Sequence, residues 1–264
     1  MKRNPFKDCI DPDLFFRTGQ HEEALVKIRI GLEDQHALIL LQGVSGTGKT
    51  LVTQVALRDL DQERFAPVFV FVFPGMGKGA LLDAILTELQ VAGGRFVHER
   101  LSRLQEAALD LAANGRRLVV VIDEAHFLKA DALHLLRTLS NLETEQEKLV
   151  TVLLVAEPGL GKRLKAPSYA SLRGRITFSL NLLPLDRQGV EQYVKFRLLK
   201  CGAGPDFLSP EIYDMVHGAS CGIPREVNRL LYTGFIDAAT RGTMPQMIDF
   251  TPSLDSESVS RCLA

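Results

Sequence analysis

The 264-residue chain has room for one large domain or two smaller ones, and its charge is balanced, with 31 Lys and Arg residues against 32 Asp and Glu. A protein that is basic over its whole surface, as many nucleic-acid-binding proteins are, is therefore not indicated. The four cysteines include no C-x-x-C pair, which argues against a zinc site or a disulfide framework, and we expect free thiols. No apolar run approaches the ~18 residues of a membrane span, so we expect a soluble, cytoplasmic protein.

The first 20 residues are irregular, and a helix is predicted over residues 20–32, where apolar residues recur at helical spacing. Residues 37–42 (A-L-I-L-L-Q) then form a short apolar run, which is typical of a buried parallel strand. Apolar residues within 51–60 return to a helical period. The glycine-rich segment between the strand and the helix matches G-x-x-x-x-G-K-[ST], the phosphate-binding loop.

The residue types of this loop suit the binding of a nucleoside triphosphate with Mg²⁺. Glycines let backbone N–H groups approach the phosphate oxygens without a Cβ in the way. Lys49 places a positive charge near the β- and γ-phosphates, and the Thr50 hydroxyl can bind Mg²⁺. The start of the following helix adds a partial positive charge. The predicted nucleotide-binding residues of this segment are Gly43, Val44, Ser45, Gly46, Thr47, Gly48, Lys49, Thr50 and Leu51.

The segment before the first strand can fold back over the adenine base of such a nucleotide. Phe15, Phe16 and His21 are the candidates for that pocket, and ordinary packing is the alternative. After the loop, residues 67–73 (P-V-F-V-F-V-F) predict a strand, because they are β-branched and aromatic. Helices are predicted over 79–91 and 99–113.

A second chemical motif follows at residues 118–124, where the apolar strand L-V-V-V-I ends in two acids. Ligands bind at the carboxyl ends of strands in open α/β sheets. We expect Asp123 to hold Mg²⁺, directly or through water, and Glu124 to polarise the attacking water. An acidic pair after an apolar strand is a weak signal alone, but it indicates a Mg²⁺ and nucleotide site when it follows a phosphate-binding loop.

A helix is predicted over 131–141 and a further strand over 149–156, which ends at Glu157. A polar side chain there could contact the γ-phosphate, although a carboxylate repels phosphate unless it is paired or protonated. From 158 to 180 the chain has five basic residues and no acids. Arg173 and Arg175 are the candidates for an arginine that reaches a neighbouring subunit's γ-phosphate, and a solvated basic face is the alternative.

Beyond residue 183 the pattern is helical, with segments predicted at 186–200, 210–218 and 224–241. Pro224 suits the first turn of the last helix. It places Arg225 at a helix N-terminus, where this arginine can contact the phosphates of the nucleotide. Acidic and basic residues are equal in number over 186–241, which argues against a nucleic-acid patch there. The tail over 242–264 is polar.

These motifs resemble the ExeA-type (general secretion pathway protein A-like) AAA+ ATPases, a group that also includes transposition-associated ATPases. The resemblance covers roughly residues 4–241. Besides the glycine-rich loop, it rests on V-V-V-I-D-E-A-H, S-N-L-E-T-E-Q-E-K-L, V-L-L-V-A-E-P-G-L, L-R-G-R-I-T and G-I-P-R-E-V-N-R-L-L.

The resemblance implies an α/β fold of the P-loop NTPase class, with a parallel αβα core over 1–183 and a helical lid over 184–241. It implies ATP with Mg²⁺ as the nucleotide, and a homo-oligomer in which one subunit completes its neighbour's site. Lys49 and Thr50 match Walker A, Asp123 and Glu124 match Walker B, and Arg225 matches the sensor-2 arginine.

The chain departs from the family in two respects. Glu157 stands where members typically have glutamine, which leaves the sensor-1 role open at this position. Secretion members usually continue into a membrane segment and a periplasmic domain, whereas this chain stops at 264, so we expect a soluble, stand-alone ATPase.

The function expected from these features is ATP hydrolysis that drives assembly or remodelling of a partner complex of secretion or pilus-type machinery. The alternative is an ATP-dependent DNA-binding regulator that recruits a transposase. A protein partner is implied in both cases, and double-stranded DNA is a candidate partner in the second.

Overall fold

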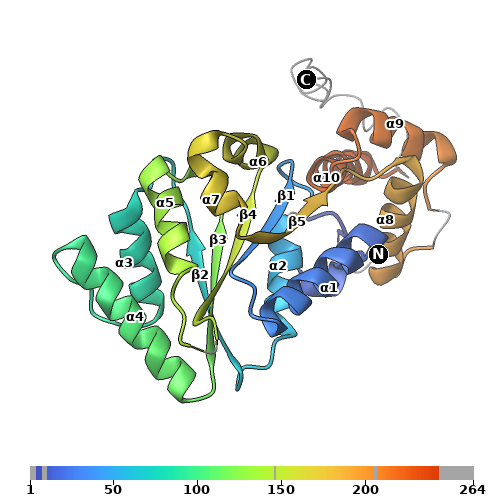
Figure 1. The fold of residues 1–264 in the computed structure, drawn as a ribbon. Coiled ribbons are helices and arrows are strands. Elements are labelled where there is room, and N and C mark those ends of the chain that lie inside the picture. Colours follow the sequence, from blue (N-terminus) through green and yellow to red (C-terminus); the bar gives the residue numbers. More distant parts are fainter. Residues whose placement is uncertain (1–3, 8–10, 146, 205–206, 244–264) are drawn as a thin grey trace. The chain divides into compact units, whose positions relative to one another are not determined.

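The computed structural model describes residues 4–7, 11–145, 147–204 and 207–243 (Figure 1). The chain divides into two compact units. The sheet unit comprises Gln20–Gly43 and Val52–Leu182, and the lid unit comprises Met1–Gly19, Val44–Leu51 and Leu183–Ala264. The predicted tail over 242–264 lies outside the described residues from 244 onward. The domain boundary predicted between 183 and 184 stays a prediction.

The described residues of the sheet unit form a five-stranded parallel sheet in the order β2-β3-β4-β1-β5. Every residue of β1 and of β4 is buried, as the continuous apolar runs of their sequences require. The predicted α/β class with a parallel core is therefore confirmed. The strands are β1 (Leu38–Gly43), β2 (Phe65–Phe71), β3 (Arg117–Asp123), β4 (Val150–Ala156) and β5 (Ile176–Leu182).

Helices cover both faces of this sheet, because strand residues on both faces are apolar (Figure 1). On one face, Leu40, Val120 and Leu154 belong to a core that includes buried residues of helices α3 to α7. On the other face, a Cβ added to Gly31 of helix α1 would lie 2.5 Å from Ile39 Cδ1, so this helix packs closely on β1. The helices are α1 (Gly19–Glu33), α2 (Lys49–Arg58), α3 (Lys78–Glu88), α4 (Val97–Ala113), α5 (Ala130–Leu139), α6 (Pro158–Leu164) and α7 (Ala170–Arg173).

Short 3₁₀ helices also occur at Pro12–Leu14 (η1), Ala125–Phe127 (η2) and Pro167–Tyr169 (η3). The sequence did not predict these, nor α6 and α7, because short helices carry too few turns for a periodic pattern to show. The longer helices lie where apolar spacing placed them, with ends that differ by a few residues.

The lid unit is built on helices α8 (Arg187–Lys200), α9 (Pro210–Ser220) and α10 (Pro224–Arg241). The Asp186 carboxylate caps α8 by accepting a hydrogen bond from the Gly189 backbone N–H at 2.6 Å. The N-terminal segment completes the helical core. The Phe6 ring is fully buried and lies 5.4 Å, between ring centroids, from that of Phe235.

Phe16 also packs into the lid unit, against the rings of Tyr193 and Phe196 at centroid distances of 5.9 Å and 5.6 Å. This arrangement is the packing alternative stated above for Phe16. Phe15 and His21 are also buried. A contact of these three residues with adenine stays a prediction.

Cysteine chemistry differs in part from the expectation. Cys201 is a buried free thiol, but Cys221 is disulfide-bonded, so the expectation of free thiols is wrong for Cys221. The spacing of cysteines in the sequence does not by itself reveal a bridge between distant residues.

Among the described helices, none combines the length and the apolar character that crossing a bilayer requires.

Candidate nucleotide-binding site

The glycine-rich loop follows β1 directly, and its backbone requires glycine at two positions. Gly46 and Gly48 have φ values of 84° and 97°, in the left-handed region that side chains with a Cβ rarely adopt. At Gly46 a Cβ would also come within 2.8 Å of the Arg225 Cβ and 2.9 Å of the Ile223 Cγ2. The motif glycine at this position is therefore required by both conformation and space.

Lys49 and Thr47 fold onto the loop itself. The Lys49 ammonium donates a hydrogen bond to the Val44 carbonyl at 3.1 Å, and the Thr47 hydroxyl donates to the same oxygen at 2.9 Å. Both side chains are buried. Helix α2 begins at Lys49, so the N–H groups of its first turn belong to the same segment. This combination of cation, turn and helix start is an anion-binding arrangement.

Arg225 contacts the loop in two ways. Its backbone N–H donates to the Gly46 carbonyl at 3.3 Å, and its guanidinium donates to the Ser45 hydroxyl at 3.1 Å. Pro224 occupies the first turn of α10, as the sequence predicted, and so sets the start of the helix at this residue. The structure thus brings the predicted lid arginine to the phosphate-binding loop within the lid unit.

The acidic pair lies at the carboxyl end of β3. The Asp123 side chain is buried, and its Oδ1 accepts a hydrogen bond from the Glu124 backbone N–H at 2.9 Å. Glu124 follows with φ 56° and ψ 34°, a left-handed conformation that is uncommon for a residue with a side chain. Such outliers concentrate at functional sites, where the surrounding structure holds them in place.

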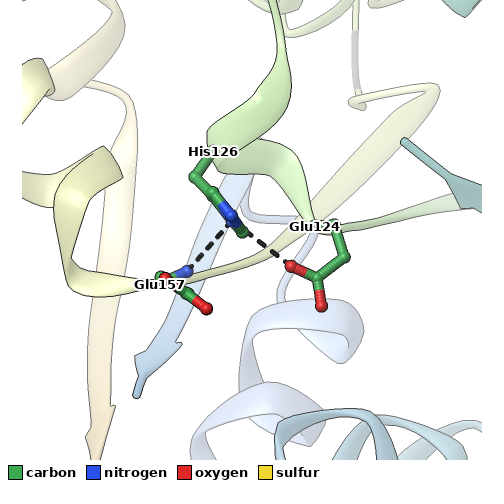
Figure 2. Close-up of side chains that lie close together, drawn as sticks. All are labelled: Glu124, His126 and Glu157. Atoms are coloured by element: carbon green, nitrogen blue, oxygen red, sulfur yellow. Dashed lines mark hydrogen bonds and ion pairs between the residues drawn. The ribbon is translucent and has the colours of Figure 1, made fainter. Parts of the chain in front are cut away.

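Figure 2 shows the surroundings of Glu124, which include a residue to which the sequence analysis gave no role. The Nδ1 atom of His126 lies 3.4 Å from Glu124 Oε2 and 3.4 Å from the backbone nitrogen of Glu157. Candidate ligand atoms of the three side chains lie within 4.8 Å of one another. The nearest sequence signal was the position of His126 two residues after Glu124, which by itself indicates no contact.

The two candidate finger arginines differ in their contacts. Arg173 donates to the carbonyls of Leu164 and Lys165, both at 3.0 Å, and so satisfies the C-terminal end of α6. The half-buried Arg175 side chain makes no hydrogen bond or ion pair with any described residue. Of the two, Arg175 is the one whose guanidinium has no partner among the described residues.

Comparisons with known proteins identify the family of the chain. A family profile described as an AAA domain matches residues 32–164. General secretion pathway protein A of Aeromonas hydrophila is 35% identical over 245 residues, which are 92% of this chain and 44% of that protein. The chain therefore spans less than half the length of this curated relative.

Solved structures show the same fold at low sequence identity. ORC2 of Aeropyrum pernix, solved in ADPNP–ADP complexes, is 17% identical with a TM-score of 0.69, covering 100% of this chain and 72% of its own. ORC1 of the same organism, in complex with DNA, is 19% identical with a TM-score of 0.69 and coverages of 98% and 67%. The RuvB Holliday junction branch migration motor of Thermotoga maritima is 17% identical with a TM-score of 0.58 and coverages of 98% and 72%.

Proposed function

The chain belongs to the AAA domain family, and on this premise we propose that it is an ExeA-type P-loop ATPase, which hydrolyses ATP to drive assembly or remodelling of a partner complex. The products are ADP and phosphate, and the partner belongs to secretion or pilus-type machinery. The name of the curated relative supports this kind of partner. The proposal includes a cytoplasmic location.

The observation that carries the proposal is the double contact of Arg225 with the phosphate-binding loop. An arginine held at Ser45 and Gly46 is placed to bind the phosphates that the loop receives. When the nucleotide changes from ATP to ADP, the number of acceptor oxygens available to this arginine changes too. Helix α10, and with it the lid unit, can therefore respond to the state of the nucleotide.

The donor set of the proposed site fits Mg²⁺. A buried carboxylate at Asp123 and a hydroxyl at Thr50 are oxygen donors, which are the ligands that Mg²⁺ prefers. When bound with ATP, the ion neutralises charge on the phosphates. Lys49 adds a second positive charge from the loop, at the start of α2.

Glu124 is proposed to orient the attacking water by accepting one of its protons in a hydrogen bond. Its side chain is 40% exposed, so water can reach it, while its backbone N–H donates to the Asp123 carboxylate. Arg175 from a neighbouring subunit is proposed to stabilise the charge of the transition state. This last role requires a homo-oligomer with shared sites.

Steady-state ATP hydrolysis by the wild type and by Glu124→Gln tests the proposal. The amide is isosteric but is a far weaker acceptor for a water proton, so turnover should fall about 10²- to 10⁴-fold. Binding of a fluorescent ATP analogue should remain. Near-normal turnover of Glu124→Gln would reject the role of this residue, and a wild type without any hydrolysis would reject the proposed activity.

The second candidate function, a DNA-binding regulator that recruits a transposase, has one structural observation in its favour. A half-open groove of about 440 Å³ lies in the sheet unit, between β1, β5 and α6. Lys162, Lys165 and Arg173 line it, together with the polar side chains of Gln42, Ser179 and Asn181. No acidic residue lines it, so it can accept the phosphates of a DNA backbone.

DNA binding distinguishes the two functions. Binding of fluorescent double-stranded DNA should weaken steeply as salt rises if the groove contacts phosphates. The double variant Lys162→Gln/Lys165→Gln should then bind more weakly and show a smaller salt slope, with Lys195→Gln on α8 as the matched surface control. Stimulation of ATP hydrolysis by DNA would favour the regulator. No binding at low salt would leave the machinery partner as the supported function.

A further inference from the structure

His126 lies between two neighbouring strand ends. Strands β3 and β4 are parallel partners, so the residues that follow them lie at the same edge of the sheet. His126 belongs to η2, directly after β3, and Glu157 is the N-cap residue of α6, directly after β4. The imidazole is also held by the ring of Phe127, at a centroid distance of 4.1 Å, and only 16% of the side chain is exposed.

The two neighbours of the imidazole require different protonation of the same atom, His126 Nδ1. The Glu157 backbone N–H can only donate, so it requires a lone pair on His126 Nδ1. The ionised Glu124 carboxylate can only accept, so it requires a proton on the same nitrogen. Both contacts measure 3.4 Å, longer than the 2.9–3.0 Å typical of such bonds. Nδ1 can satisfy only one neighbour at a time.

We propose that His126 is a positioning residue for Glu124, and that the backbone N–H of Glu157 competes with Glu124 for His126 Nδ1. This inference rests on the proposed role of Glu124 in orienting water. With a proton on Nδ1, His126 donates to Glu124 Oε2 and fixes the carboxylate, which leaves Oε1 for the water. With a lone pair on Nδ1, the ring bonds to Glu157 instead, and Glu124 loses this restraint.

The competition links the turn between β4 and α6 to the catalytic carboxylate. Among the described residues, His126 Nδ1 is the acceptor of the Glu157 N–H. If this turn moves away from His126, the bond from the Glu157 N–H breaks and Nδ1 can donate to Glu124. If the turn moves toward His126, Nδ1 accepts from Glu157 and no longer donates to Glu124. Glu157 thereby acts through its backbone N–H, which every residue except proline can supply at this position.

Two substitutions of His126 test the positioning role. His126→Leu removes both hydrogen bonds, and we expect kcat to fall about 10- to 100-fold, as for other residues that orient a reacting group. The affinity for a fluorescent ATP analogue should change little, because a positioning role gives His126 no contact with the nucleotide. His126→Asn offers an amide N–H to Glu124 and an amide oxygen to the Glu157 N–H, so it should restore most of kcat. An unchanged kcat in His126→Leu would overturn the proposal.

The competition has a matched pair of variants at Glu157. Its φ of −78° suits proline, and Ala156 before it is in a strand, so Glu157→Pro removes the N–H with little strain. Glu157→Ala removes the same carboxylate and keeps the N–H. Because one competing hydrogen bond is deleted, we expect kcat of Glu157→Pro to exceed that of Glu157→Ala about 2- to 10-fold. Equal or lower kcat in the proline variant would contradict the competition.

An activity-independent measurement separates this inference from the proposed function. The ¹⁵N NMR signal of the His126 imidazole, assigned by its loss in His126→Asn, reports whether Nδ1 carries a proton. It should move toward the protonated-nitrogen position in Glu157→Pro relative to Glu157→Ala. If the enzyme hydrolyses no ATP but this shift occurs, the proposed function fails and the competition stands. An identical signal in the two variants overturns the competition whatever the activity.

Discussion

At the scale of single residues, the site depends on positions where only one residue type fits. Gly46 combines a left-handed backbone with contacts that leave no room for a Cβ. Arg225 occupies the space that this glycine leaves, and its guanidinium reaches Ser45. Gly46 and Arg225 thus fit against each other, and a change at either position disrupts the contact between the loop and α10.

Arg225→Ala should therefore weaken the response to nucleotide more than other changes on the same helix. Loss of a charge-assisted hydrogen bond should raise the Kd for ATP about 10- to 100-fold. Arg229→Ala is the matched control, because Arg229 lies one turn along α10 and its guanidinium pairs, among the described residues, only with Glu226 in a surface ion pair. Calorimetric titration with ATP measures both. Equal affinities in the two variants would show that Arg225 does not contact the phosphates.

At the scale of elements, the N-terminal segment is part of the lid core. Phe6 lies far from α10 in the sequence, yet its ring is buried against Phe235, within a cluster that spans α8, α9 and α10. A core built from only three helices is small, and small cores are only marginally stable. The aromatic residues of the segment add buried apolar area to this core.

Phe6→Ala should accordingly destabilise the lid unit by about 3–5 kcal/mol, the usual cost of truncating a buried phenylalanine. Ile236→Ala on α10 is the control, since Ile236 is 46% exposed and should change stability by less than about 0.5 kcal/mol. Urea unfolding followed by circular dichroism gives both free energies of unfolding. A loss below about 1 kcal/mol in Phe6→Ala would mean that the segment is not needed for the lid core.

At the scale of the whole molecule, the proposed activity requires more than one copy of the chain. The Arg175 side chain has no hydrogen-bond or ion-pair partner among the described residues, as the proposed role in a neighbour's site requires. Arg173 is committed to the end of α6, so its loss would instead disturb α6 and α7. The different surroundings of these two arginines allow a shared site to be tested directly.

Mixing two inactive variants tests the shared site. Arg175→Ala should bind ATP but hydrolyse it slowly, and Glu124→Gln should behave likewise for a different reason. If sites are shared, a mixture contains pairs in which an intact Glu124 meets an intact Arg175, so activity should return on mixing. Activity that merely averages the two variants would show that Arg175 does not act in trans. Loss of nucleotide binding in Arg175→Ala would point to a folding defect.

The sequence by itself determined the elements whose pattern is local. The phosphate-binding loop, the strand that ends in Asp123 and Glu124, and the proline-led helix at Arg225 were all predicted, because each combines turn or charge residues with a period of a few residues. The parallel sheet followed from apolar runs that had to be buried on both faces. The AAA domain family followed from the same motifs.

Only the tertiary structure decided the contacts between residues that are distant in the chain. Arg225 meets Ser45 across 180 positions, and His126 meets the backbone of Glu157 across 31. The burial of Phe6 in the lid core is of the same kind. Such pairs leave no periodic trace, because burial and hydrogen bonding between separate elements depend on how those elements pack. The pattern along the chain specifies each element, and the packing specifies which side chains those elements bring together.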